Sequence, residues 1–444
     1  MMLVPKIVHI LQLESYNNKD YTRWLGKNFK IAFKPGLKQL IFVTAYLVFM
    51  IITNLVIGTF WPSFLDNIYL ILVENFGLFV LFYIVNFLQV MQDKKLRKTA
   101  KKKLVYTARA KRLMFWNFIL MILVEASYTI DWINYSAGTI SQFEGRLIIY
   151  TILIFLIPFN AAIANFFAWP TERAIADNYI FFAKIKLWKK AYKKLIKIGI
   201  TGSYGKTSTK FILKTILSEK YNVLASPESY NTSMGNVRVI REMLKPEHEV
   251  LIAEMGARYK GDIREICDFV NPQIAMITSI GPQHLESFKT IENVQKAKAE
   301  IINALPYNGT VFLPKDNPYC MQLYNKETRE KFCYSVSDKN ADIYAKNIEL
   351  NENGSSFIAV TPIGEINCKT KLLGEHNILN ILGAISIAIH LKLSKEEISR
   401  GVEKIESIPH RLQIINNGNN IVIDDAFNSN PVGSKMAIDV LRTI

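Results

Sequence analysis

The sequence predicts a chain of two unlike halves: a multi-pass α-helical membrane domain of four spans, followed by an α/β domain with a mostly parallel sheet. Three observations lead to this fold class. Long apolar segments with few or no charges crowd the first 169 residues. A strongly basic stretch separates the second of these segments from the third. From residue 196 onwards, short apolar runs alternate with amphipathic stretches, which is typical of α/β domains.

Each of the four apolar segments is long enough to cross a bilayer as a helix. The first and last contain no charged side chain, the second contains one and the third contains two. Glu125 lies near the middle of the third, where a carboxylate is either functional or hydrogen-bonded inside a helix bundle. The predicted spans are residues 39–61, 68–91, 113–135 and 147–169.

The loop charges predict how these spans are oriented. Residues 92–112 hold ten Lys and Arg and a single Asp, so the positive-inside rule places this loop in the cytoplasm. We expect a cytoplasmic segment over 1–38, a transmembrane domain over 39–169 and a cytoplasmic catalytic region after it. The protein is thus predicted to be a multi-pass protein of the cell membrane. Its net charge of +16 then indicates membrane lipids as partners rather than nucleic acid.

The region after the spans begins with a linker and contains the cysteines. Residues 170–195 mix aromatic residues and lysines at helical spacing, which predicts an amphipathic interfacial helix. The cysteines are scattered and include no C-x-x-C pair, so a zinc ribbon and a disulfide framework are both disfavoured. They are Cys267, Cys320, Cys333 and Cys368.

A phosphate-binding turn is predicted at residues 202–207, which read G-x-x-G-K-T. This spacing is shorter than the common G-x-x-x-x-G-K-[ST] loop. An apolar strand at 195–200 precedes the turn and an amphipathic helix at 208–220 follows it. Backbone N–H groups at such a helix start can bind phosphate, while Lys206 would reach the terminal phosphates and Thr207 could ligate Mg²⁺.

Two further strands would bring polar side chains to the same edge of the sheet. Glu254 ends the apolar run 249–257, where it could hold a metal, cap a helix or form a salt bridge. His284 follows a third strand within 271–288, and its role could be structural. The helix predicted at 290–302 carries Lys296 and Lys298, and by pattern alone it reads as a solvated face.

Several motifs, in this order, resemble those of the Mur ligases. They are "GITGSYGKTST", "EMGA", "GPQHLESF", "AKAEI", "GEHNILNILGAISIA" and "HRLQIINNGNNIVIDDAFNSNPVGSKMAI". The resemblance is strongest to the branch that adds D-alanyl-D-alanine to UDP-N-acetylmuramoyl-tripeptide, and it covers residues 196–444. It implies a central ATP-binding domain over 196–408 and the truncated beginning of a Rossmann-like C-terminal domain over 409–444.

The resemblance implies a role for each matching residue. Lys298 would be carbamylated by CO₂ and so become an anionic metal ligand, which reverses its reading as a solvated lysine. Catalysis would fall to Lys206, Lys298 and His284, and Mg²⁺ would be held by Thr207, Glu254, His284 and Lys298. The phosphates of ATP would be cradled by Gly202, Ser203, Tyr204, Gly205, Lys206, Thr207 and Ser208.

The remaining implied contacts surround ATP and the substrate. Asn377 and Asn380 would lie near adenine, and Arg411 and Asp425 would close over ATP. The substrate would be met by Asn231 and Thr232.

The implied activity is an ATP-dependent carbon–nitrogen ligation of peptidoglycan synthesis that proceeds through an acyl phosphate. The partners would be ATP, Mg²⁺, a peptidoglycan precursor and an amine resembling D-alanyl-D-alanine. Membrane spans where relatives carry a UDP-binding domain leave two other acceptors open, poly-γ-glutamate and a lipid-linked wall precursor. A membrane-tethered nucleoside triphosphatase and a non-catalytic nucleotide-binding scaffold are the alternatives from other classes.

Overall fold

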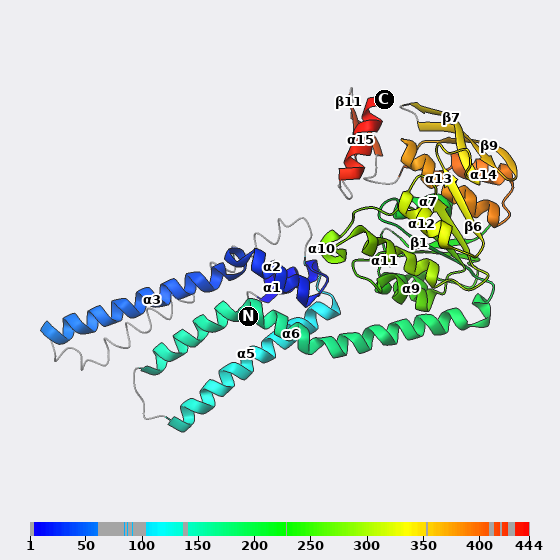
Figure 1. Cartoon of the computed structure of the whole chain (residues 1–444). Coiled ribbons are helices and arrows are strands. Elements are labelled where there is room, and N and C mark those ends of the chain that lie inside the picture. The colour runs from blue at the N-terminus through cyan, green and yellow to red at the C-terminus, as the bar shows by residue number, and fades with distance from the viewer. Residues whose placement is uncertain are drawn as a thin grey trace. The chain divides into compact units, whose positions relative to one another are not determined.

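The computed structural model describes residues 4–60, 84, 87, 91, 104–135, 141–227, 229–351, 354–407, 413–417, 420–424 and 431–443. The chain divides into two compact units, Met1–Ile175 and Ala176–Ile444. Figure 1 shows the elements of both.

The first unit is built from helices. An Asn17 cap begins one of them, because its side-chain oxygen accepts hydrogen bonds from the backbone N–H groups of Lys19 and Asp20 at 2.9 and 3.3 Å. The helices are α1 (Val4–Leu13), α2 (Asn18–Lys27), α3 (Phe29–Phe60), α5 (Ala108–Tyr135) and the first part of α6 (Ser141–Trp188).

The prediction of four membrane spans is wrong for the described part of the chain. No helix there combines the length with the apolar character that a bilayer crossing requires. The predicted span 68–91 lies outside the described residues except at positions 84, 87 and 91, and so does the side chain of Glu125. The predicted multi-pass membrane location depended on these spans and is therefore wrong as well. The expectation of membrane lipids as partners loses its basis for the same reason.

The apolar sequence of this region is used in part for packing between helices. Phe33 of α3 and Ile157 and Ala161 of α6 share one buried cluster with side chains of α1 and α2. The buried hydroxyl of Tyr21 donates to the carbonyl of Pro158 at 2.8 Å. Hydropathy counts apolar residues without showing what covers them, so the sequence alone could not distinguish a helical core from lipid-facing spans.

A nine-stranded sheet organises the second unit. Its strand order is β2-β3-β1-β4-β5-β6-β7-β8-β9, with parallel pairing from β2 to β7 and antiparallel pairing from β7 to β9. The mostly parallel sheet of the prediction is therefore present. The strands are β1 (Ile196–Thr201), β2 (Val223–Ala225), β3 (Val250–Glu254), β4 (Ile274–Ile277), β5 (Thr310–Pro314), β6 (Lys331–Ser335), β7 (Ile343–Asn351), β8 (Gly354–Thr361) and β9 (Gly364–Thr370).

Strand β1 lies between β3 and β4, where the chain changes from one half of the sheet to the other. Sheets of this kind bind ligands beyond the carboxyl ends of their strands at this point. The turn after β1, Glu254 at the end of β3 and the segment after β4 all lie at that edge.

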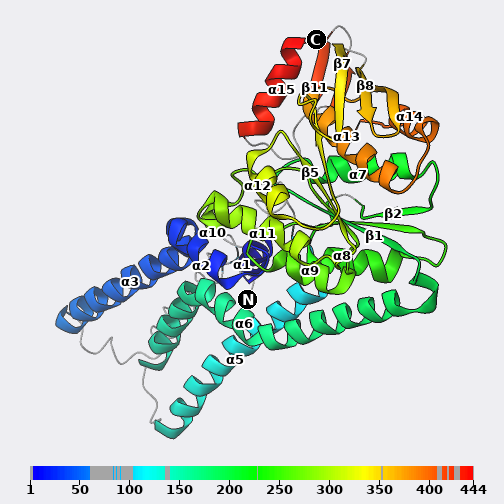
Figure 2. The same cartoon turned by 45° about the vertical axis from the view of Figure 1, so that its right-hand side comes forward.

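Helices cover both faces of the sheet (Figure 2). Along β3, alternate residues enter the two cores: Ile252 packs on one side, and Leu251 and Ala253 pack on the other. The first face is covered by α7 (Lys206–Leu217), α13 (Glu375–His390) and α14 (Lys395–Glu403). On or beside the second lie α8 (Ser233–Arg238), the π-helical turn η3 (Val239–Met243), α9 (Asp262–Val270), α10 (Leu285–Phe288), α11 (Ile291–Asn303) and α12 (Pro318–Lys326).

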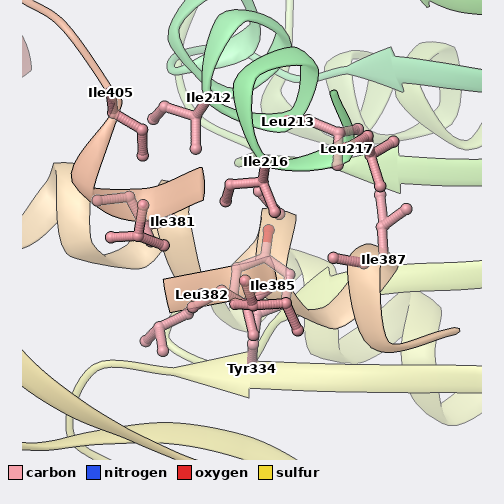
Figure 3. Close-up of a cluster of buried hydrophobic side chains, with 14 of the residues drawn as sticks. Ile212, Leu213, Ile216, Leu217, Tyr334, Ile381, Leu382, Ile385, Ile387 and Ile405 are labelled. Carbon is pink, nitrogen blue, oxygen red and sulfur yellow. The ribbon is translucent and has the colours of Figure 1, made fainter. Parts of the chain in front are cut away.

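The contact between α7 and α13 joins the phosphate-loop helix to the predicted adenine-binding segment. Ile212 and Ile216 of α7 face Ile381 and Ile385 of α13 over Tyr334 of β6 (Figure 3). All of these side chains are buried. The position of α13 relative to the loop is therefore set by apolar packing.

Residues 176–195 of the predicted interfacial linker belong to the second unit. Its residues continue α6 as far as Trp188 and then form a short 3₁₀ turn, η2 (Lys190–Tyr192). Ala183 and Leu187 are buried in the core of the second unit. Lys186 Nζ donates to the carbonyl of Arg241 at 3.0 Å. Ala183 and Leu187 thus contact protein, whereas Phe181, Phe182 and Trp188 of the same helix are 54%, 50% and 73% exposed.

The described part of residues 409–444 contains two strands and one helix. Strands β10 (Gln413–Asn417) and β11 (Asn420–Asp424) pair antiparallel, and α15 (Pro431–Thr443) follows them. Val440 of α15 packs against Leu373, just before α13.

His376, in the first turn of α13, should make the second unit sensitive to acid. Burial lowers the pKa of this imidazole from 6.5 to about 4. Between these values the unfolded chain binds a proton that the folded chain does not, so stability is full above pH 6.5 and is lost as the pH falls. From pH 7 to 4.5 the free energy of unfolding should drop by about 2–3 kcal/mol through this group. Urea unfolding of His376→Gln should show a correspondingly shallower drop; an equal drop in both proteins would contradict the assignment.

Candidate active site

The turn between β1 and α7 is a short loop bounded by two glycines whose backbone conformations other residues rarely adopt. Gly202 has φ +154°, and a Cβ atom there would lie 2.1 Å from the Thr278 hydroxyl oxygen. Gly205 has φ +80° and precedes the first residue of α7, Lys206. Lys206 Nζ folds back over the loop and donates to the carbonyl of Gly202 at 2.7 Å. A helix start of this kind can bind an anion, and the Lys206 ammonium lies beside it.

The segment after β4 braces this loop. The backbone N–H of Tyr204 donates to the hydroxyl of Ser279 at 2.9 Å, and the Tyr204 hydroxyl donates to the carbonyl of Pro282 at 2.9 Å. The Ser203 hydroxyl donates to the carbonyl of Gly281 at 2.9 Å. The side chains of Ser203 and Tyr204, both predicted to contact ATP, thus hold the phosphate loop against the segment that leads to His284.

Glu254 lies directly beneath the loop and is fully buried. Its Oε1 accepts hydrogen bonds from the Thr207 hydroxyl at 3.0 Å and from the Asn231 amide at 3.1 Å. Its Oε2 lies 3.1 Å from Lys210 Nζ, in an ion pair of two fully buried side chains. The structure thus brings Thr207, Asn231 and Glu254 together. The salt bridge that the sequence left open as an alternative role for Glu254 is also present, with Lys210 as the partner.

Thr232 stands one residue beyond this cluster and has a local role. Its hydroxyl accepts a hydrogen bond from the backbone N–H of Gly235 at 3.2 Å and caps α8. This cap fixes the turn that directs Asn231 toward Glu254.

Lys298 on α11 is buried, with 1% of its surface exposed. Burial, followed by the charge of Lys206, lowers its pKa to about 7, although Asp262 and Glu300 act in the opposite direction. Among the described residues it forms no ion pair, because Glu300 is engaged elsewhere and accepts hydrogen bonds from the backbone N–H groups at the start of α9. Lys296, two residues earlier, is exposed. Lys298 is therefore a buried amine that readily loses its proton.

His284 occupies a strained position before the short helix α10, with φ +52°. Loss of hydration lowers the pKa of its imidazole, and the charges of Arg258, Lys298 and Lys206 lower it further. The charges of both predicted catalytic lysines thus lower the pKa of His284. They favour its neutral form, which is the form that ligates metals.

The two residues predicted to lie near adenine, Asn380 and Asn377, have different surroundings. Asn380 stands beside the loop: a Cβ added to Gly205 would be 2.8 Å from its Oδ1. Asn377 is buried and donates from its side-chain amide to the carbonyl of Leu373 at 2.8 Å. Ser208 is buried in the first turn of α7. Arg411 and Asp425 lie outside the described residues.

Sequence reasoning missed Lys210 and the hydrogen bond from Tyr204 to Ser279 that braces the loop. A signal for Lys210 was present, since it lies one helical turn after Lys206 among positions that the helix buries. No pattern within the sequence pointed to its partner, because Glu254 lies on a strand 44 residues away.

In the parts of the chain that the structure describes, no group of three or more His, Cys, Asp or Glu side chains is placed to hold a metal ion. Of the predicted metal ligands, Glu254 and His284 are the carboxylate and the imidazole, and both lie in the described residues. Lys298 could join them only after its cationic head had become an anion.

Comparison with known proteins agrees with this arrangement. Residues 200–388 match the Mur ligase middle domain. The UDP-N-acetylmuramoyl-tripeptide--D-alanyl-D-alanine ligase of Buchnera aphidicola (subsp. Baizongia pistaciae) is 34% identical over 271 residues, 61% of this chain and 59% of that protein. The ligase of the same name from Escherichia coli K12 is 29% identical over 269 residues, covering 60% and 59%. The chain thus spans about three fifths of the length of these curated relatives.

Solved structures give the same picture. The crystal structure of MurF from Acinetobacter baumannii superposes with a TM-score of 0.57 at 28% identity, covering 61% of this chain and 58% of that one. MurF from Thermotoga maritima in complex with ADP shares the fold, with a TM-score of 0.53 at 23% identity over 60% of this chain and 61% of that one. Residues 200–388 of this chain therefore resemble a Mur ligase middle domain in sequence and in fold.

Proposed function

We propose that this protein is an ATP-dependent carbon–nitrogen ligase that joins an amine to a carboxylate through an acyl phosphate. The observation that carries the proposal is Lys298, a buried amine with a pKa of about 7 and no ion-pair partner among the described residues. Lys206 is near enough to lower the pKa of Lys298, and both lysines lower the pKa of His284. A simple nucleoside triphosphatase has no use for such an amine. A ligase site that carbamylates it gains an anionic ligand.

The chain's own groups fit phosphoryl transfer. The start of α7 and the Lys206 ammonium would bind and neutralise the ATP phosphates. An oxygen of the substrate carboxylate attacks the γ-phosphorus, and the bond from that phosphorus to ADP breaks. The amine nitrogen then attacks the carbonyl carbon of the acyl phosphate, inorganic phosphate leaves, and the nitrogen loses a proton. The protein supplies position and charge and forms no covalent bond to the substrate.

The residues present also fit Mg²⁺. Glu254 Oε2 is paired with the Lys210 ammonium at 3.1 Å but accepts no directed hydrogen bond within the described residues, so it could still ligate a cation. The Thr207 hydroxyl lies beside the other oxygen of the same carboxylate. Carbamylated Lys298 would add oxygens of the hard type that Mg²⁺ prefers, with His284 as the nitrogen ligand. The ion would supply neutralisation of phosphate charge.

For the substrates we propose UDP-N-acetylmuramoyl-tripeptide as the carboxylate and D-alanyl-D-alanine as the amine. The support is the name shared by the relatives with about 30% identity over three fifths of their length. The same proposal includes the remaining contacts. Asn231 and Thr232 would lie beside the substrate, and Asn377 and Asn380 near adenine. Arg411 and Asp425 would lie above ATP.

The test is co-substrate dependence. With Mg²⁺, the intact protein should consume ATP only when the carboxylate and the amine are both present, and mass spectrometry should show one amide product per ADP. ATP hydrolysis at the same rate without either co-substrate would identify a nucleoside triphosphatase instead. Ligation of another acceptor, such as poly-γ-glutamate, would keep the reaction class and change the substrate.

A further inference from the structure

Lys210 and Glu254 form a fully buried ion pair next to the phosphate loop. The ammonium lies 3.1 Å from Glu254 Oε2, and neither side chain is exposed to solvent. Burying two charges is costly unless both have further partners, and such pairs add little stability over apolar residues of the same size. A gain in stability therefore does not by itself account for this buried lysine.

The partners of Glu254 come from separate parts of the chain and fix its direction. Thr207 of α7 and Asn231 both donate to Oε1. Asn236 of α8 donates to the Glu254 backbone carbonyl at 2.9 Å, so the strand end is held as well. Oε2 receives the charge of Lys210 but no directed hydrogen bond within the described residues.

Lys206 and Lys210 lie one turn apart on α7, and their side chains have different partners: loop carbonyls for Lys206 and Glu254 for Lys210. Lys206 turns toward the loop carbonyls, on the side where phosphates would lie. Lys210 turns into the domain, where its Nζ also lies 4.4 Å from the ring centre of Phe211. Its charge is thus directed at Glu254 and away from solvent.

We propose that Lys210 is a positioning residue for the metal ligand Glu254. It balances the charge of this buried carboxylate and holds it in place before nucleotide arrives, and so sets how tightly a divalent cation is held. The inference rests on the proposed function, in which Glu254 binds the metal. Without Lys210 the carboxylate would be buried with hydrogen bonds on one oxygen only, and it would turn or draw in water.

The experiment measures Mn²⁺ binding rather than turnover. The intact protein is saturated with ADP and titrated with Mn²⁺, and free Mn²⁺ is followed by electron paramagnetic resonance. Lys210→Met should weaken Mn²⁺ binding by about tenfold or more, as removal of an outer-shell partner usually does. Its metal-free affinity for ADP should stay within about threefold, because the Lys210 ammonium is buried against Glu254. Lys214→Met removes the same charge from an exposed position one turn further along α7 and should bind Mn²⁺ as the parent does.

A double-mutant cycle separates this role from simple packing. Lys210→Met combined with Glu254→Gln leaves a neutral pair that should fold even if Lys210→Met alone does not. Lys210→Gln, which keeps a hydrogen-bond donor without the charge, serves as a second single variant and should also weaken Mn²⁺ binding. Since Lys210 acts through Glu254, the double variant should bind Mn²⁺ as Glu254→Gln alone does.

Three results would overturn the inference. The first is Mn²⁺ binding that is unchanged or tighter in the folded single variants. The second is a double variant that binds Mn²⁺ more weakly than Glu254→Gln. The third is unchanged binding in Glu254→Gln itself, which would remove Glu254 from the metal site and so refute the proposed metal role along with the inference.

Discussion

Replacement of Lys298 by alanine should abolish amide formation, with a loss of about a hundredfold or more in turnover, because a metal ligand contributes several kcal/mol to the transition state. The structure gives the reason. Lys298 is buried without an ion pair among the described residues, and its pKa of about 7 leaves a large fraction of the amine neutral near neutral pH. Only the neutral amine reacts with CO₂, whereas an exposed lysine with a pKa near 10.5 is almost wholly protonated there.

The same residue sets an expected pH and CO₂ dependence. Carbamylation requires loss of the proton, so activity limited by CO₂ should rise as the pH increases through about 7 and should fall when dissolved CO₂ is removed. Formate or acetate added to Lys298→Ala should restore part of the activity by occupying the vacated ligand position.

Lys296→Ala is the matched control for this prediction. It removes the same charge two residues away on α11, from an exposed side chain, and turnover should change by less than about twofold. An essential Lys296 with a dispensable Lys298 would refute the assignment, and the metal site with it.

Replacement of Lys206 by alanine should reduce turnover by a factor of about 10²–10³, the usual effect of removing one group that stabilises developing charge. Its Nζ donates to the loop carbonyls of Gly202 and Ser203, so the ammonium lies at the loop where phosphates would bind. Because this side chain is only partly buried, the free energy of unfolding should change by less than about 1 kcal/mol. Steady-state assays and urea unfolding of the same preparation measure both quantities.

Lys214→Ala, further along the same helix and exposed, controls for loss of charge on α7. If Lys206→Ala turned over ATP and formed amide at the parent rate, the loop would not be the phosphate site. A variant that lost activity only because it unfolded would show a lowered urea midpoint, so the two cases are distinguishable.

The elements that carry the candidate site could be predicted because their patterns are local. The expected strands at 195–200 and within 249–257 correspond to β1 and β3, and the helix expected at 290–302 corresponds to α11. Apolar runs flanked by glycine-rich turns and amphipathic stretches report on sheet and helix without knowledge of their partners.

Burial of charged side chains could not be predicted from such patterns. On α11 the solvated-face reading is right for Lys296 and wrong for Lys298, and the two differ only in what the fold places over them. The burial of Lys210 could not be predicted either, since its ion-pair partner, Glu254, is remote in sequence. The prediction of membrane spans was wrong for a related reason. An apolar segment does not show which of its residues other helices will cover.

The most direct test of the proposed ligase is transfer of oxygen from the carboxylate to phosphate. The intact protein would be incubated with ATP, Mg²⁺, D-alanyl-D-alanine and UDP-N-acetylmuramoyl-tripeptide whose terminal carboxylate carries ¹⁸O. An acyl phosphate requires that one carboxylate oxygen leave with the phosphate when the amine attacks. Each amide formed should therefore yield one inorganic phosphate, and with fully labelled carboxylate that phosphate should contain one ¹⁸O atom by mass spectrometry. Phosphate without ¹⁸O, released at a rate that does not depend on the amine, would contradict the proposed reaction.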